Sequence, residues 1–108
     1  MEQLSITEKQ GANYILYDVA GVLNTYTITE LAEKLDENIK KSNIVVDLEK
    51  IDNIDSVGVG LLMATFNDGE DQGHRFYMMN PSPTVRVALE ETGFYDVFFI
   101  IHAVTEVQ

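Results

Sequence analysis

The densest group of side chains that could do chemistry lies between residues 47 and 56. There Asp47, Asp52, Asp55 and Ser56 follow an apolar run. Paired carboxylates can act as general acid and base, several acids together can hold magnesium, and a serine hydroxyl can accept a phosphate. In open α/β sheets such groups gather at the carboxyl ends of strands. This segment is therefore the first candidate for a functional site.

Two interpretations of Ser56 follow from its place before an apolar, helix-forming run. Serine is a common N-cap, because its hydroxyl accepts hydrogen bonds from the free amides of a first helical turn. The reciprocal partner of a capping box is absent, since Val59 stands three positions onward. Alternatively the hydroxyl accepts a phosphate, whose charge the N-terminus of a helix tolerates. The residues alone leave both interpretations open.

Gly58 and Gly60 flank Val59 in the same predicted helical region, where each glycine costs about 1 kcal/mol relative to alanine. The string is no phosphate-binding loop, because it lacks the longer glycine spacing and the Lys-Ser/Thr pair of such loops. The two missing side chains either let a partner approach Ser56 or let the helix pack closely on its own sheet. The sequence favours neither explanation.

Other residue types give no support to a metal or cofactor site. His74 and His102 have no metal-ligand spacing around them, and the absence of cysteine excludes disulfides, zinc knuckles and thiol catalysis. A magnesium-dependent phospho-aspartate pocket would need an acidic pair after the first core strand and a late lysine. Asp18 instead lies within a predicted strand, and no lysine follows Lys50. We expect neither a metal nor a cofactor.

The composition is that of a small acidic protein with a single domain spanning residues 1–108. Seven Lys and Arg residues oppose 18 Asp and Glu residues, so the net charge of −11 repels the phosphates of nucleic acids. The longest strictly apolar run, Val97–Ile101, is too short to cross a membrane. The segment Met1–Leu4 has no basic flank or apolar core of an export signal. We expect a cytoplasmic protein that binds neither nucleic acid nor membrane.

Five segments have the β-branched and aromatic composition of strands. They are Leu4–Glu8, Tyr14–Ala20, Asn43–Leu48, Arg75–Met79 and Val97–Ile101. The stretch Ile44-Val45-Val46 is apolar without a break, which is typical of a parallel strand buried on both faces. Gln10–Asn13 joins the first two strands as a hairpin, and residues 49–55 form a loop.

Three segments have the apolar spacing and the end signals of helices. They run from a cap at Thr27 or Thr29 to about Lys41, from Val57 to Phe66, and from Thr84 to Thr92. Asn67-Asp68-Gly69 and Gly93 supply stops, and Pro83 suits a first turn. The order strand–strand–helix–strand–helix–strand–helix–strand predicts an α/β fold, a mixed and mostly parallel β-sheet packed against α-helices.

The central segment resembles the signature of STAS domains, and more narrowly that of bacterial anti-sigma factor antagonists. The resemblance rests on Ile44–Leu48 followed by Ile54–Leu62, which contains the string Asp-Ser-x-Gly-x-Gly between a valine-rich strand and a helix. Gly21–Asn24, Gly73–Phe76 and Thr92–Phe98 resemble further family segments, so the likeness covers nearly the whole chain. It implies the STAS fold.

The resemblance also implies a switch that catalyses no reaction. Family members bind an anti-sigma factor that is also a serine kinase, and so free the sigma factor. The kinase phosphorylates the serine that aligns with Ser56, which releases the antagonist, and a serine phosphatase resets it. The positions implied to bind the partner are Asn24, Asp55, Val57, Gly58 and Val59.

Three departures from the family pattern stand out. Val57 replaces a second serine of many members, which leaves Ser56 as the hydroxyl of the site, and Asn24 replaces the usual acid. Gln108 follows the last predicted strand closely, so the terminal helix of many members is expected to be short or missing. Two alternatives remain, a STAS scaffold or regulator of another signalling pathway, and a small enzyme that uses Asp47, Asp52 and Asp55.

Overall fold

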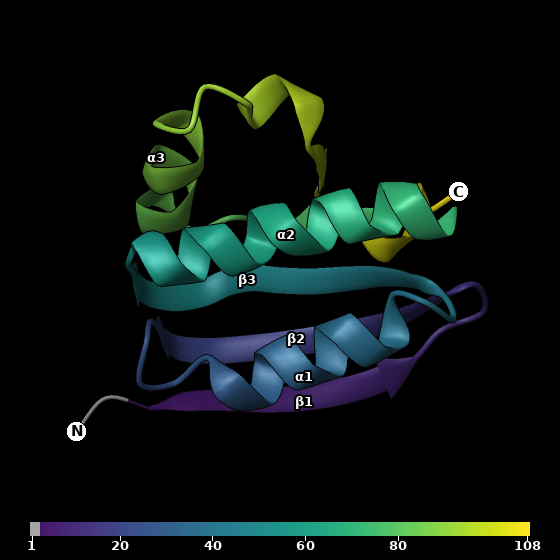
Figure 1. Cartoon of the computed structure of the whole chain (residues 1–108), viewed down its shortest axis with the longest axis horizontal. Coiled ribbons are helices and arrows are strands. Elements are labelled where there is room, and N and C mark those ends of the chain that lie inside the picture. Colours follow the sequence, from purple (N-terminus) through teal and green to yellow (C-terminus); the bar gives the residue numbers. More distant parts are fainter. Residues whose placement is uncertain (1–2) are drawn as a thin grey trace.

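In the computed structural model, residues 3–108 form a five-stranded sheet with three helices packed on one face (Figure 1). The strands are β1 (Leu4–Gln10), β2 (Tyr14–Leu23), β3 (Asn43–Ile54), β4 (Phe76–Met79) and β5 (Phe99–Ile101), and the helices are α1 (Thr29–Asn38), α2 (Ser56–Gln72) and α3 (Pro83–Glu90). Met1 and Glu2, part of the segment predicted to carry no export signal, lie outside the described residues.

The strands follow one another across the sheet in the order β1-β2-β3-β4-β5. β1 runs antiparallel to β2, and the remaining neighbours are parallel. Each parallel connection passes through a helix on the same face, as right-handed crossovers require. The predicted fold class, a mostly parallel sheet with one antiparallel edge, is confirmed.

The core lies between the sheet and the helices, and β3 is buried on both of its sides. Ile44 and Val46 belong to the cluster under the helices. Val45 points to the opposite face, where it joins a smaller cluster that Val104 and Val107 of the C-terminal segment cover. The alternation along a strand places successive side chains on opposite faces, so this run explains the unbroken apolar sequence.

β2 and β3 are longer than predicted, and the predicted ends at Ala20 and Leu48 are wrong. β2 continues through Gly21, which adopts φ of +115° where a side chain would collide with the Gln3 backbone. Two register irregularities then allow β3 to stay paired with β2 as far as Ile54. β4 pairs with β3 only up to Asp47, so the polar residues that suggested a loop can face solvent within a strand.

α1 is shorter than predicted and has no side-chain cap. Thr27 donates its hydroxyl to the Val22 carbonyl at 2.7 Å, and Thr29 is the first helical residue. The helix ends at Asn38 and not near Lys41. The side-chain amide of Asn38 donates hydrogen bonds to the Lys34 carbonyl and to the Tyr17 hydroxyl. Such side-chain hydrogen bonds compete with continuation of the helix.

α2 is longer than predicted, because the stop expected at Asn67-Asp68-Gly69 does not act. Gly69 lies inside the helix, where a Cβ atom would sit 2.8 Å from the His74 carbonyl oxygen. The helix ends at Gly73, whose φ of +76° is the left-handed conformation typical of a C-cap. The prediction was wrong because Gly69, which is needed for close packing, was interpreted as a glycine that ends the helix.

The last elements differ from prediction by a few residues. α3 begins at Pro83 and is capped by the Ser82 hydroxyl, and Gly93 turns the chain after it with φ of +81°. β5 begins at Phe99, because Tyr95–Val97 form a 3-10 turn. After β5 the described chain contains a second such turn at Val104–Glu106.

Candidate functional site

The candidate site lies where β3 passes into α2, next to the loop that joins β2 to α1. Asp55 stands between the two elements, and its amide donates to the Leu23 carbonyl at 3.2 Å. Its carboxylate accepts a hydrogen bond from the Thr25 amide at 3.4 Å. These bonds join the end of β3, the start of α2 and the β2–α1 loop.

Asp55, and not Ser56, is the N-cap of α2. Its Oδ1 atom accepts hydrogen bonds from the amides of Val57 and Gly58, each at 3.0 Å. The interpretation of Ser56 as the cap is therefore wrong. A carboxylate satisfies the free amides of the first turn, and its charge suits the positive end of the helix dipole. Asp55 consequently shapes the site through its own hydrogen bonds.

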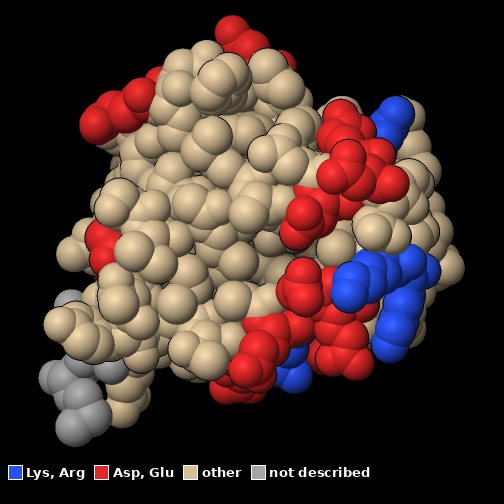
Figure 2. All heavy atoms as spheres, in the orientation of Figure 1, with Lys and Arg blue, Asp and Glu red and all other residues tan. Residues whose placement is uncertain are grey.

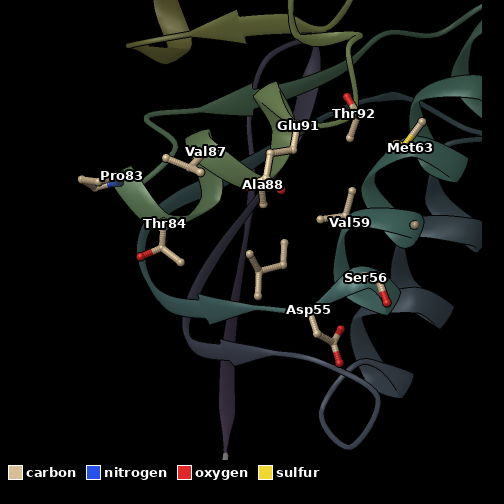
Figure 3. A pocket seen from close by; sticks show the side chains of 12 residues that line it. Asp55, Ser56, Val59, Met63, Pro83, Thr84, Val87, Ala88, Glu91 and Thr92 are labelled. Carbon is tan, nitrogen blue, oxygen red and sulfur yellow. The ribbon is translucent and has the colours of Figure 1, made fainter.

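Ser56 is the first residue of α2, and its side chain is exposed. In the part of the chain that the structure describes, its hydroxyl has no hydrogen-bond partner. Figure 3 shows the hydroxyl near Asp55, at one end of a groove. With the capping task taken by Asp55, nothing in the fold uses this hydroxyl, so it is free to be modified or contacted.

Gly58 and Gly60, two residues apart, face different surroundings. Gly58 is buried, and a Cβ atom there would lie 2.5 Å from the Leu23 carbonyl oxygen and 2.7 Å from the Ile54 side chain. Gly60 is exposed, and a Cβ atom there would meet nothing within 4 Å. Close packing thus explains the first glycine, whereas the second leaves open space on the outer surface. Close packing is therefore confirmed for Gly58, and the approach of a partner beside Gly60 stays a prediction.

An open groove of about 820 Å³ runs between the outer side of α2 and α3 (Figure 3). We call it the α2–α3 groove. Its lining is Ile54, Asp55, Ser56, Val59, Gly60, Met63, Pro83, Thr84, Val87, Ala88, Glu91 and Thr92. Only Asp55 and Glu91 among these carry charge, so the groove presents mainly apolar surface beside the Ser56 hydroxyl.

The α3 side of the groove was missed from sequence, above all Val87, which is 53% exposed. Its place could have been found from helical spacing. Val85 and Leu89, four residues apart, are buried in the core, so Val87 between them must point away from it. The resemblance directed attention to the α2 signature alone, and α3 lies some thirty residues later in the chain.

The other predicted partner-binding residues occupy different depths. Val57 is 43% exposed, and Val59 is half-buried in the groove lining. Asn24 is only 8% exposed, and its Oδ1 atom accepts a hydrogen bond from the Tyr26 amide at 2.9 Å. Asn24 therefore shapes the loop beside Asp55, while Thr25 and Tyr26 of that loop are exposed.

The structure does not bring the predicted acids together. Asp47 and Asp55 lie eight positions apart in sequence, with Asp47 on β3 and Asp55 just after its end, so at the rise of an extended chain they are about 25 Å apart. Asp47 accepts a hydrogen bond from the Glu49 amide, and Asp52 is exposed. Residues 3–108 contain no group of three or more acids, histidines or cysteines that could hold a metal ion. Asp47 is therefore too far from Asp55 to act together with it.

The outer side of α2 is uncharged over its first two-thirds. Residues 56–67 include no Asp, Glu, Lys or Arg, whereas acids begin at Asp68 and continue with Glu70 and Asp71. Figure 2 shows this as a broad uncharged face with acidic side chains at its border. Among residues 3–108, no helix is long and apolar enough to cross a membrane. The uncharged face borders the α2–α3 groove.

Comparison with known proteins gives a match to one family. The model of the STAS domain matches residues 3–107. A curated relative, the anti-sigma-B factor antagonist of Staphylococcus aureus (strain NCTC 8325 / PS 47), is 30% identical over 84 residues, which cover 76% of this chain and 78% of that protein.

Solved structures support the fold. An anti-sigma factor antagonist from Mycobacterium paratuberculosis superposes with a TM-score of 0.81 at 20% identity, over 95% of this chain and 89% of that chain. The Bacillus cell fate determinant SpoIIAA in its phosphorylated form superposes with a TM-score of 0.76 at 21% identity, over 94% of this chain and 95% of that chain.

Proposed function

The chain belongs to the STAS domain family, and we propose that it is an anti-sigma factor antagonist whose binding is controlled by phosphorylation of Ser56. In this proposal residues 1–108 form a single domain that binds an anti-sigma factor and catalyses no reaction. The anti-sigma factor is also the serine kinase, and a serine phosphatase reverses the modification. Because the partner regulates transcription, the protein acts in the cytoplasm.

One observation carries the proposal: Ser56 offers an exposed, unbonded hydroxyl at the edge of an apolar groove. A kinase can reach that hydroxyl without disturbing the fold, because Asp55 already caps the helix. SpoIIAA, which shares the fold, has been solved in a phosphorylated form, and the 30% identical relative is an antagonist of the anti-sigma-B factor. The SpoIIAA structure agrees with control by phosphorylation, and the 30% identical relative agrees with the role of an antagonist.

The switch works through the charge that a phosphate brings to the groove. Phosphorylation adds about −1.5 to −2 charges, and the helix N-terminus tolerates them locally. A partner that covers the groove must then bury or expel this charge beside Asp55, and an unpaired buried charge costs several kcal/mol. A loss of about 2.8 kcal/mol lowers affinity about a hundredfold, which is enough for release.

The remaining site residues divide into contacts and supports. Val57 and Val59 supply apolar contact beside Ser56, and Gly58 lets the first turn lie against Leu23. Asp55 and Asn24 hold the turn and the neighbouring loop through their hydrogen bonds. A partner therefore meets a surface that is already in its binding shape, which reduces the entropy lost on binding.

The test is to locate the phosphate by intact mass and fragment analysis. The purified chain is incubated with ATP and the anti-sigma-B factor of Staphylococcus aureus, whose own antagonist is the positive control. We expect one phosphate on the parent chain and none on Ser56→Ala. Thr84→Ala is the matched control, because Thr84 is another exposed hydroxyl in the same groove, and it should still be modified.

Two results would contradict the proposal. A phosphate on Ser56→Ala but not on Thr84→Ala would show that Thr84 of α3, and not Ser56, is the modified residue. If the parent chain carries no phosphate while the positive control is modified in the same mixture, this anti-sigma factor is not a kinase of the chain.

A further inference from the structure

A second apolar hollow lies farther along α2 than the groove. We call it the distal hollow, and its lining is Met63, Phe66, Asn67, Phe94, Val97 and Phe98. Its volume is about 310 Å³. It is formed where the segment between α3 and β5 passes over α2, the yellow-green part of the ribbon in Figure 1.

Two large apolar side chains of this hollow are exposed without a reason in the fold. Phe94 is 52% exposed and Val97 is 55% exposed, although Phe98 beside them is buried. Phe98 packs edge-on against Phe66 at a centroid distance of 5.3 Å, so the core beneath is already complete. Burying a side chain of this size contributes about 1.5–3 kcal/mol, which these two residues leave unrealised.

The segment that carries Phe94 and Val97 is held by its own hydrogen bonds. The Phe94 amide donates to the Thr92 hydroxyl at 3.1 Å, and the Val97 amide donates to the Phe94 carbonyl at 2.9 Å. Apolar side chains on a segment whose backbone is already held in place lose little conformational entropy when a partner covers them. They are therefore suited to binding.

The distal hollow adjoins the α2–α3 groove. Met63 lines both, and no charged residue interrupts α2 between Ser56 and Asn67. Twelve residues line the groove, whereas a stable interface commonly uses about 20–30 residues on each side. A partner seated over Ser56 therefore needs more surface than the groove offers, and the distal hollow is the adjoining apolar surface.

The charges around the hollow select the kind of partner. Its lining includes no charged residue, and Asp96 is exposed beside it. Arg86, the cation of the neighbouring helix, is held by Glu90 at 3.3 Å and by the Tyr95 ring. A second copy of a chain with net charge −11 would place acids against acids. An apolar side chain flanked by Lys or Arg fits this surface.

We propose that the distal hollow is a second contact for the anti-sigma factor, an inference that rests on the proposed function. An apolar side chain of that partner enters between Phe94 and Val97, and a basic residue beside it faces Asp96. Met63 is seven residues from Ser56, about 10 Å along the helix, so the two contacts act nearly independently. Phe94 and Val97 then set affinity in both phosphorylation states, while Ser56 sets the difference between those states.

The experiment measures the affinity of the purified chain for the anti-sigma-B factor of Staphylococcus aureus, with and without phosphate on Ser56. The double variant Phe94→Ala/Val97→Ala should bind at least tenfold more weakly in both states, with an unchanged ratio between them. The matched control is Val104→Ala/Val107→Ala, which truncates two apolar side chains on the opposite face of the sheet. It should retain the parent affinity, and circular dichroism confirms that each variant is folded.

The outcomes separate the two proposals. If the parent chain does not bind, the proposed function fails. If the parent binds and the Phe94/Val97 variant binds within twofold of it, or if the control variant weakens equally, the distal contact is overturned and the proposed function stands. A dimer of the parent chain that this variant dissociates, with partner affinity unchanged, would also overturn the inference, in favour of self-association.

Discussion

The inner and outer sides of the first turns of α2 are both built from glycine and apolar residues, but their surroundings differ. On the inner side, Gly58 lies against the Leu23 carbonyl, and Leu62 is buried completely. On the outer side, Val57 is 43% exposed, and the space beyond Gly60 is empty. Packing explains these two inner residues, whereas the described chain leaves these two outer positions largely uncovered.

The contrast separates the residues of this helix that stabilise the fold from those that are available for binding. An apolar side that is exposed and uncharged contributes little to the stability of the isolated chain, and extended patches of this kind mark interaction sites. Substitutions on the inner side should therefore change stability, and substitutions on the outer side should change partner affinity. Each of the following predictions tests one side of that division.

The largest effect on stability is expected for Gly58→Ala. The new Cβ atom would lie 2.5 Å from a backbone carbonyl oxygen, which cannot rotate away. Overpacking of this kind costs about 3 kcal/mol at the upper end of its usual range, despite the better helix propensity of alanine. Urea unfolding of the variant and parent measures the difference. A loss below about 0.5 kcal/mol, which is close to experimental error, would show that the inner side is not tightly packed.

The core next to α1 should also govern the alkaline limit of stability. Burial, assisted by the charge and hydrogen bond of Glu8, raises the pKa of Tyr17 from 10.0 to about 12. The unfolded chain then releases this proton first as the pH rises, so stability is complete below pH 10 and falls between about pH 10 and 12. The full loss, reached once the folded chain also ionises, is about 3 kcal/mol, since the shift covers two pKa units and each unit corresponds to about 1.4 kcal/mol.

Tyr17→Phe isolates this effect, because it keeps the ring and removes the ionisable hydroxyl. The variant should lose less stability than the parent between pH 10 and 12 in urea titrations. An identical alkaline decline in both proteins would assign it to other groups.

The cap of α2 connects the two sides and should have an intermediate effect. Asp55→Ala removes the acceptor for two helix amides and for the Thr25 amide, and loss of an N-cap costs about 1 kcal/mol. Asp52→Ala is the matched control, an exposed acid just before the same turn, and should leave the unfolding midpoint unchanged. Equal loss in the two variants would point to net charge as the cause.

The smallest effect, and one of opposite sign, is expected for Gly60→Ala. Its Cβ atom meets nothing within 4 Å, so the better helix propensity should raise stability by about 0.5–1 kcal/mol. The same methyl group enters the α2–α3 groove and should weaken partner binding. If Gly58→Ala and Gly60→Ala change stability in the same direction, the division between inner and outer sides fails.

The sequence was sufficient for the fold class, whereas the site residues stay a prediction. Hydrophobic spacing and the run Ile44–Val46 predicted a mostly parallel sheet with helices, and the Asp-Ser-x-Gly-x-Gly string directed attention to Ser56. Residue types alone could not separate two helix starters in succession. Asp55 takes the cap because its backbone is extended, with φ of −109° and ψ of −175°, a geometry that depends on the end of β3.

The remaining errors concern contacts between distant segments. β3 continues through Asp52 and Asn53 because β2 remains beside it, which no local signal indicates. From sequence alone, Gly58 and Gly69 cannot be distinguished from glycines that end or weaken helices. In the structure, both lie against backbone carbonyls from outside α2. The groove could not be predicted from the α2 segment, because α3 forms its other side. α3 is distant from Ser56 in the sequence and lies across the groove from it in the fold.

The central claim is that phosphate on Ser56 controls the binding of an anti-sigma factor by the outer side of α2. The most direct measurement compares the affinity of the unmodified chain and of the chain with phosphoserine at position 56 for the anti-sigma-B factor of Staphylococcus aureus. The account predicts at least about a hundredfold loss on phosphorylation, equivalent to about 2.8 kcal/mol, with an unchanged unfolding midpoint. Equal affinity of the two forms would contradict it.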